Sequence, residues 1–112
     1  MEKGYYRIHL VSRGGDGDQV TIFLPLDASG SYDRTAPKPH LFEMTWDGQR
    51  YHGRFETTVE RYNRFSFVGH CQDQLTELAK APIRVGSIVR IFESDSEGND
   101  WWGFVVRDMK KL

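Results

Sequence analysis

The chain has few of the residues and segments from which a function is usually assigned. Cys71 is its only cysteine among 112 residues, so no intramolecular disulfide can form and no zinc site can be built from cysteines. Neither sign of charge dominates, because 15 Lys and Arg face 16 Asp and Glu, and this argues against tight non-specific binding to nucleic acid. No apolar run approaches the roughly 20 residues of a membrane span, and Met1–Arg7 has no apolar leader core. We therefore expect one cytoplasmic domain over residues 1–112, with no membrane partner.

Signatures of catalysis and metal binding are also missing. The histidines show neither the helical i, i+4 spacing nor an HExxH or HxH pattern; they are His9, His40, His52 and His70. Gly14–Gln19 is similar to one calcium-binding GGxGxD repeat, but it occurs once and ends in Gln. Cys71 is more typical of a small apolar side chain than of a nucleophile, since no triad partner is identifiable. We predict a protein that is not an enzyme and that holds no metal and no cofactor.

What the chain does contain is a series of alternating apolar and polar runs, the period of half-buried strands. The most regular run, Gln49–Glu60, follows Asp47-Gly48, the pair favoured in a tight type I′ hairpin. The seven runs are Tyr5–Val11, Gln19–Leu24, Leu41–Trp46, Gln49–Glu60, Phe65–Val68, Ser87–Phe92 and Trp101–Val106. The last two are expected to form a hairpin around an acidic turn, Glu93–Asp100, and the basic tail Arg107–Leu112 is expected to fray.

One segment carries a helical pattern. Cys71–Ala81 places Cys71, Leu75 and Leu78 on one stripe, and Pro82 prevents its continuation. We therefore predict a mainly β, seven-stranded barrel, because closure removes exposed sheet edges, with this one short α-helix before the C-terminal hairpin. The expected inward side chains are Ile8, Leu10, Ile22, Leu24, Phe55, Phe67, Leu75, Leu78 and Phe104.

Two loops are candidate binding loops, and the segments that contain them resemble parts of one protein family. Arg61–Arg64 (RYNR) offers arginine and asparagine donors, which read guanine and adenine edges in a major groove. Ser12–Pro25 (SRGGDGDQVTIFLP) resembles the start of the EcoRII-type restriction endonuclease effector domain, where an Asn-Asp-Thr-Gly loop and a His-Gln pair precede an apolar strand ending in Pro. Gly15–Gly17 stands at that loop, and Asp18-Gln19 stands at the His-Gln pair. Arg61–Gly69 is similar to the Arg-containing turn and following strand of the same family.

The resemblance implies a fold and a function. This family and the plant B-three domains share a DNA-binding pseudobarrel that grips duplex DNA with two loops. By position, the loops here are Arg13–Gln19 and Arg61–Arg64, and they are expected on one side of the barrel around a cleft of ~12 Å, the width of a major groove. The residues expected to contact double-stranded DNA are Arg13, Asp16, Gln19, Arg61, Tyr62, Asn63 and Arg64.

Two other functions stay open. A small β-barrel inhibitor or immunity-type protein would bind another protein through its acidic loops, Asp16–Asp18 and Glu93–Asp100, and the near-neutral net charge favours this hypothesis. An enzyme built on the His- and Glu-bearing face of Gln49–Glu60 is the least favoured. Oligomeric state is not predicted.

Overall fold

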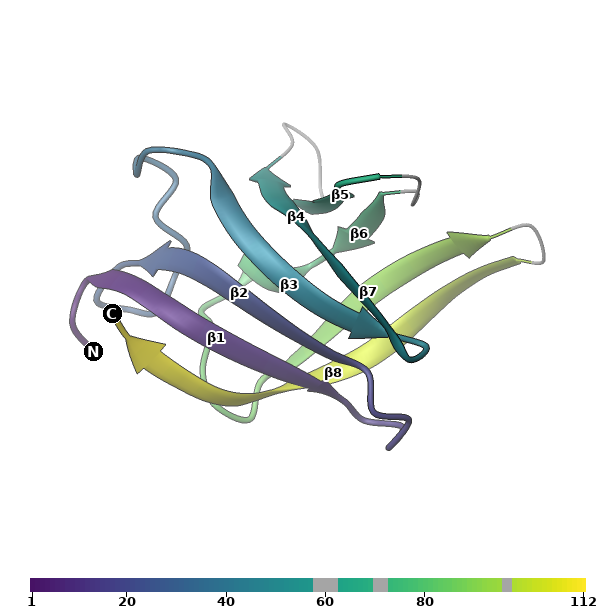
Figure 1. Ribbon diagram of the computed structural model, residues 1–112. Helices are drawn as coiled ribbons and strands as arrows, with labels where there is room; N and C mark the ends of the chain where they lie inside the picture. The colour runs from purple at the N-terminus through teal and green to yellow at the C-terminus, as the bar shows by residue number, and fades with distance from the viewer. Residues whose placement is uncertain (58–62, 70–72, 96–97) are drawn as a thin grey trace.

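The strands follow one another in chain order around a closed antiparallel barrel (Figure 1). This is a computed structural model that describes residues 1–57, 63–69, 73–95 and 98–112. Each strand pairs with the next, and β8 pairs with β1 to close the sheet. The elements are β1 (Gly4–Ser12), β2 (Gln19–Leu26), β3 (His40–Trp46), β4 (Gln49–Thr57), β5 (Asn63–Phe67), β6 (Gln74–Thr76), the 3₁₀ turn η1 (Leu78–Lys80), β7 (Ile88–Asp95) and β8 (Gly98–Lys111). The mainly β barrel is confirmed, with eight strands in place of the predicted seven.

Alternation along the strands decides which side chains fill the barrel. An eight-stranded barrel has an interior just wide enough for side chains to fill it, and here Phe42, Phe55, Phe65 and Phe104 lie fully buried in it. Of the predicted inward residues, Phe67 and Leu75 are only half-buried. The others are buried as expected, namely Ile8, Leu10, Ile22, Leu24, Phe55, Leu78 and Phe104.

The predicted helix Cys71–Ala81 is wrong. Residues 70–72 lie outside the described residues, and the rest forms β6 followed by the short turn η1. Leu75 pairs with Arg64 of β5 and with Phe92 of β7, so β6 joins two strands that would otherwise keep unpaired edges. A helix this short is marginal by itself, and the backbone hydrogen bonds offered by two neighbouring strands outweigh its weak preference.

The C-terminal tail is also different from its prediction. Residues 107–111 continue β8 instead of fraying, and residues 108–111 pair with Tyr6–His9 of β1. This pairing closes the barrel, which explains why a basic, polar segment is ordered. The expected acidic turn Glu93–Asp100 is likewise mostly strand, since β7 runs to Asp95 and β8 begins at Gly98.

The up-and-down order gives the barrel two distinct ends. One end, the hairpin end, carries the β1–β2 loop, the β3–β4 turn and the far end of the β7–β8 hairpin (Figure 1). Asp47 and Gly48 form its tight turn, and both have the positive φ that a type I′ turn requires. The opposite end, the terminus end, carries both chain ends and the junction between Thr57 of β4 and Asn63 of β5.

Candidate functional site

The first loop expected to grip DNA lies at one end of the barrel, and Asn63 and Arg64, the described residues of the second, lie at the other. The β1–β2 loop belongs to the hairpin end, where the Asp18 carboxylate accepts a hydrogen bond from the Asp47 backbone N–H at 2.9 Å. The second loop follows β4, which runs from the hairpin end at Gln49 to the terminus end at Thr57. Eight residue steps along a strand cover about 26 Å, far more than the ~12 Å of a major groove. The predicted cleft between the two loops is therefore wrong, because an antiparallel meander sends its first and fourth connections to opposite ends.

The residues of the first loop are held by local contacts. The Asp16 carboxylate accepts hydrogen bonds from the Asp18 backbone N–H and the Ser12 hydroxyl, and these lower the pKa of Asp16. Arg13 lies over Gly103 of β8, with its Cδ 3.3 Å from the place where a Cβ would stand. The Gln19 side-chain oxygen lies 2.8 Å from Nε2 of His9, on the outer face of the sheet.

The second predicted loop is used differently from the prediction. Arg61 and Tyr62 lie outside the described residues. Asn63 is 6% exposed, and its side-chain oxygen accepts a hydrogen bond from the Ala79 backbone N–H at 3.1 Å. Arg64 lies on the outer side of β5 and forms an ion pair with Asp73 at 3.7 Å. Asn63 therefore braces the η1 turn from inside and offers nothing at the surface.

The hairpin end instead contains a groove of its own, with a volume of about 450 Å³. The β1–β2 loop and the β3–β4 turn meet there beside β8, because odd-numbered connections of the meander share one end. The groove, which we name the hairpin-end groove, is lined by Asp16, Asp18, Trp46, Asp47, Gly48, Tyr51 and Trp102. Its walls combine three carboxylates with three aromatic rings.

The carboxylates of this groove sit close enough to influence one another. Burial raises the pKa of Asp18, and the nearby charges of Asp16 and Asp47 raise it further, while the hydrogen bond from the Asp47 N–H works against them. A carboxylate whose charge is disfavoured by its neighbours gains most from a cation brought beside it. The groove therefore has an electrostatic preference for positive groups.

The aromatic walls of the groove are anchored in the core. Trp46 stacks on the buried Phe104 with ring centroids 5.7 Å apart, and it meets Trp102 edge-to-face at 6.2 Å. Trp102 itself is 39% exposed. Ring faces attract ammonium and guanidinium groups, so the rings and the carboxylates favour the same kind of ligand.

Sequence reasoning identified part of this groove. The acidic loop Asp16–Asp18 was a candidate for protein binding, but Trp46 and Asp47 were assigned only to a strand and a turn. Trp101 and Trp102 alternate along β8, yet both are partly exposed, 36% and 39%. The adjacency of the β1–β2 and β3–β4 turns follows from strand order alone, and it was the signal that could have found the groove.

Comparison with protein-family models, curated proteins and solved structures finds no match for this chain. Within the described ranges, no three His, Cys, Asp or Glu residues are grouped in a way that could hold a metal ion. That part of the chain also contains no helix with the length and apolarity needed to cross a membrane.

Proposed function

We propose that this protein binds a basic surface of another protein through the hairpin end of its barrel, as a small inhibitor or immunity protein would. The observation that carries the proposal is the hairpin-end groove, which is lined by Asp16, Asp18 and Asp47 together with the partly exposed Trp102. Tryptophan in a partly desolvated groove is the side chain most often found to dominate binding energy at protein interfaces. Carboxylates around it provide steering and specificity towards a basic partner.

The strand arrangement at this end supports the same proposal. β8 continues past its last pair with β1, and beyond Phe92, the last β7 residue paired with β6, the two strands form a two-stranded arm that reaches Asp95 and Gly98 (Figure 1). The arm brings Glu93, Asp95 and Asp100 to the same end by backbone position. By sequence and backbone position, these residues add to the acidic character of the hairpin end, which suits a basic partner.

The test is affinity capture of partners under native conditions, with the same chain altered at the groove. In the Asp16→Asn/Asp47→Asn variant both local backbone roles survive, because an asparagine oxygen still accepts at position 16 and asparagine tolerates the positive φ at position 47. We expect this variant and Trp102→Ala to lose a partner that the natural chain retains. The retained partner should be basic, and its retention should weaken as salt is raised.

A matched control removes two charges elsewhere. Glu2→Gln/Glu56→Gln changes the net charge by the same amount at acids outside the hairpin-end groove. It should keep the partner with unchanged affinity. Equal loss in both double variants would show a general charge effect, and equal retention in all variants would place the interface elsewhere, so either result contradicts the proposal.

DNA binding is tested in the same series. Duplex DNA is a second candidate ligand, because Arg61–Gly69 resembles the Arg-containing turn and strand of the DNA-binding family. Binding between two loops on one side of the barrel is no longer part of this hypothesis. A low-salt titration with randomised duplex should show no sequence that is retained above the others. Selective retention that is lost in Arg64→Ala would favour DNA over the protein partner.

A further inference from the structure

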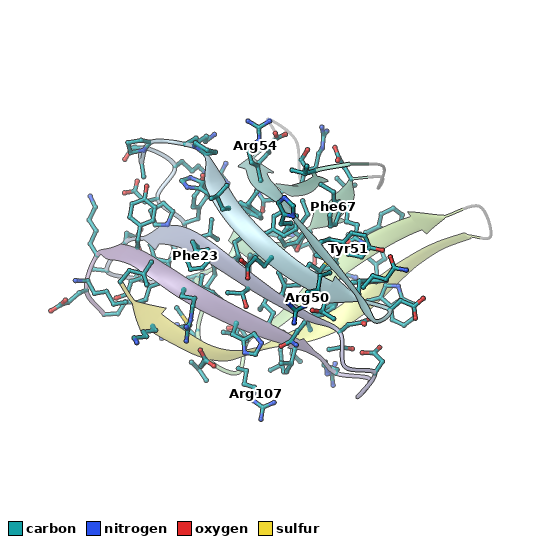
Figure 2. The ribbon with its side chains drawn as sticks, viewed as in Figure 1. Phe23, Arg50, Tyr51, Arg54, Phe67 and Arg107 are labelled. Atoms are coloured by element: carbon teal, nitrogen blue, oxygen red, sulfur yellow. The ribbon has the colours of Figure 1, made fainter. Side chains whose placement is uncertain are left out.

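A second groove crosses the outward side of β1–β4. Two adjoining hollows of about 470 Å³ and 390 Å³ share Thr21 and Glu43 and together span all four strands. We name this the flank groove. Tyr51 borders both it and the hairpin-end groove, but the other lining residues differ. In Figure 2, Phe23 and Arg50 mark its two sides over the strands nearest the viewer.

Strand register brings polar side chains of one face into a row. His9 pairs with Thr21, Thr21 with Glu43, and Glu43 with His52, so one lateral row crosses four strands. Directly opposite residues in neighbouring strands are close enough to act on one ligand together. The row ends beside β8, where Nδ1 of His9 lies 3.6 Å from the Asp108 carboxylate.

Some of these polar groups are already held in place. His9 is fixed between Asp108 and the Gln19 side chain, which lies 2.8 Å from its Nε2. Strand positions are more rigid than loop tips, so little order has to be gained when a ligand binds. The flank groove is thus a polar surface whose His9 and Gln19 side chains are already ordered before a ligand binds.

Arginines stand at diagonally opposite corners of the groove. Arg7 lies on β1, two residues before the His9 position, and Arg50 lies on β4, two residues before His52 on a strand running the other way. Three strand spacings and four residue steps separate their backbones by roughly 15–20 Å. Glu43 is the one carboxylate among the residues that line the two hollows in the described part of the chain. A ligand that satisfies both arginines must be extended and carry negative charges well apart.

We propose that the flank groove binds an acidic oligosaccharide, a chain of sugars that carries carboxylate groups. Arginine binds carboxylates through two parallel hydrogen bonds, which suits Arg7 and Arg50 at the corners. Between them, the groups that exchange hydrogen bonds with sugar hydroxyls are Gln19, Thr21, Glu43, Thr45 and His52. This site is separate from the protein-binding function proposed above and does not depend on it.

Two observations favour a sugar over a nucleic acid. Glu43 occupies the middle of the row, where it can accept hydrogen bonds from the closely spaced hydroxyl groups of a sugar chain, which a phosphate backbone does not offer. Binding of single strands also needs successive exposed rings for base stacking. Here Phe23 is half-buried, and the Tyr51 ring packs edge-to-face on Phe67 with centroids 5.7 Å apart.

Calorimetric titration of the full chain with an oligogalacturonate hexamer tests the proposal. We expect saturable binding that falls about tenfold or more in Arg7→Gln and in Arg50→Gln, since each substitution removes a hydrogen bond to a charged group. Glu43→Gln should strengthen binding, because it removes the one repulsive charge and keeps a hydrogen-bonding group. Arg84→Gln, an exposed arginine outside the groove, is the matched control and should bind as the natural chain does.

The comparison ligands decide between alternatives. Neutral maltohexaose should bind weakly or not at all, and an oligothymidine of similar charge should bind more weakly than the hexamer. Tighter binding of the oligothymidine, weaker binding by Glu43→Gln, or equal binding by Arg50→Gln and Arg84→Gln would overturn the proposal. Unchanged thermal unfolding of each variant shows that any loss of binding is not a loss of folding. Loss of the protein partner in the hairpin-end variants leaves this titration unaffected, so the two proposals fail separately.

Discussion

His40 shows how much one buried side chain depends on its neighbours. It is 2% exposed, and neither ring nitrogen has a hydrogen-bond partner among the residues that the structure describes. Its ring is enclosed by Tyr5 and Tyr32, with centroid distances of 6.3 Å and 5.5 Å. Burial lowers the pKa of His40 below its ordinary 6.5, and the charge of Lys38 lowers it further. The folded protein therefore holds this histidine neutral.

We predict that His40 makes the protein less stable in mild acid. As the pH falls below 6.5, His40 takes up a proton in the unfolded chain but not in the folded one, so the free energy of unfolding falls until the lower folded-state pKa is reached. His40→Leu should remove this part of the pH dependence. Urea unfolding midpoints of both proteins at pH 7.5 and pH 5 provide the measurement, and an equally large fall in the variant would contradict the prediction.

At the scale of the strands, Gly53 allows β4 and β5 to approach each other closely. A Cβ built at this position of β4 would lie 1.9 Å from the Ser66 carbonyl oxygen of β5. Backbone cannot move aside as easily as a flexible side chain can. The glycine is therefore part of the β4–β5 pairing and not a weakness in the strand.

Substitution at Gly53 should disrupt that pairing. Gly53→Ala is expected to lower the free energy of unfolding by about 3 kcal/mol or more, at the upper end of overpacking costs. Gly103→Ala is the control, because its nearest neighbour at 3.3 Å is the flexible side chain of Arg13. Chemical denaturation of the two variants should show a clear difference, and similar losses would mean that β5 shifts freely.

The short strand β6 depends on one buried hydroxyl. Thr76 is fully buried, donates to the Arg90 carbonyl at 2.8 Å and accepts from the Leu78 backbone N–H at 3.2 Å. The same side chain thus ties β6 to β7 and begins the η1 turn. A helix over Cys71–Ala81 would not form these two hydrogen bonds of the Thr76 hydroxyl.

Thr76→Val keeps the shape of the side chain and leaves the Leu78 N–H without its partner. We expect a loss of about 1–3 kcal/mol, the cost of an unsatisfied buried donor. Thr21→Val on the outer face should change stability by less than about 0.5 kcal/mol. Equal effects of the two substitutions in equilibrium unfolding would argue against this role of Thr76.

At the scale of the whole molecule, closure of the barrel rests on the C-terminal strand. Four residue pairs join residues 108–111 of β8 to Tyr6–His9 of β1, and the Leu112 N–H donates to the Tyr5 carbonyl at 2.9 Å. Without them the first part of β1, up to His9, would become an open edge, while Leu10–Ser12 would stay paired with β8. Sheet edges of this kind promote pairing with other chains.

Removal of residues 107–112 should therefore be costly. With about 1 kcal/mol for each lost backbone hydrogen bond, we expect the free energy of unfolding to fall by roughly 2–6 kcal/mol and the truncated chain to self-associate. Arg107→Gln/Lys110→Gln in the full-length chain should change little. Thermal unfolding and sedimentation compare the two, and a truncated chain as stable as the control would show that the tail is dispensable.

The local chemistry of the chain was enough to determine its class and most of its interior. Alternation placed Ile8, Leu10 and Phe55 inside because side chains on a strand change face at every residue. Asp47-Gly48 predicted its tight turn since both residues tolerate positive φ. These features depend on neighbours along the chain, which a sequence displays directly.

Only the tertiary structure determined the conformation of β6 and of the C-terminal tail, and the positions of the predicted binding residues. The pattern of Cys71–Ala81 suits a helix locally, but two neighbouring strands offer it hydrogen bonds that no local pattern records. Asparagine is a residue type that often recognises ligands at a surface. Asn63 is nevertheless buried, and its side-chain oxygen accepts a hydrogen bond from the Ala79 backbone N–H. The strand order placed the end of β4 and the start of β5 opposite the loop after β1, because each antiparallel strand reverses the direction of the chain. That reversal moved the candidate site from an arginine-bearing cleft to the acidic, aromatic hairpin end.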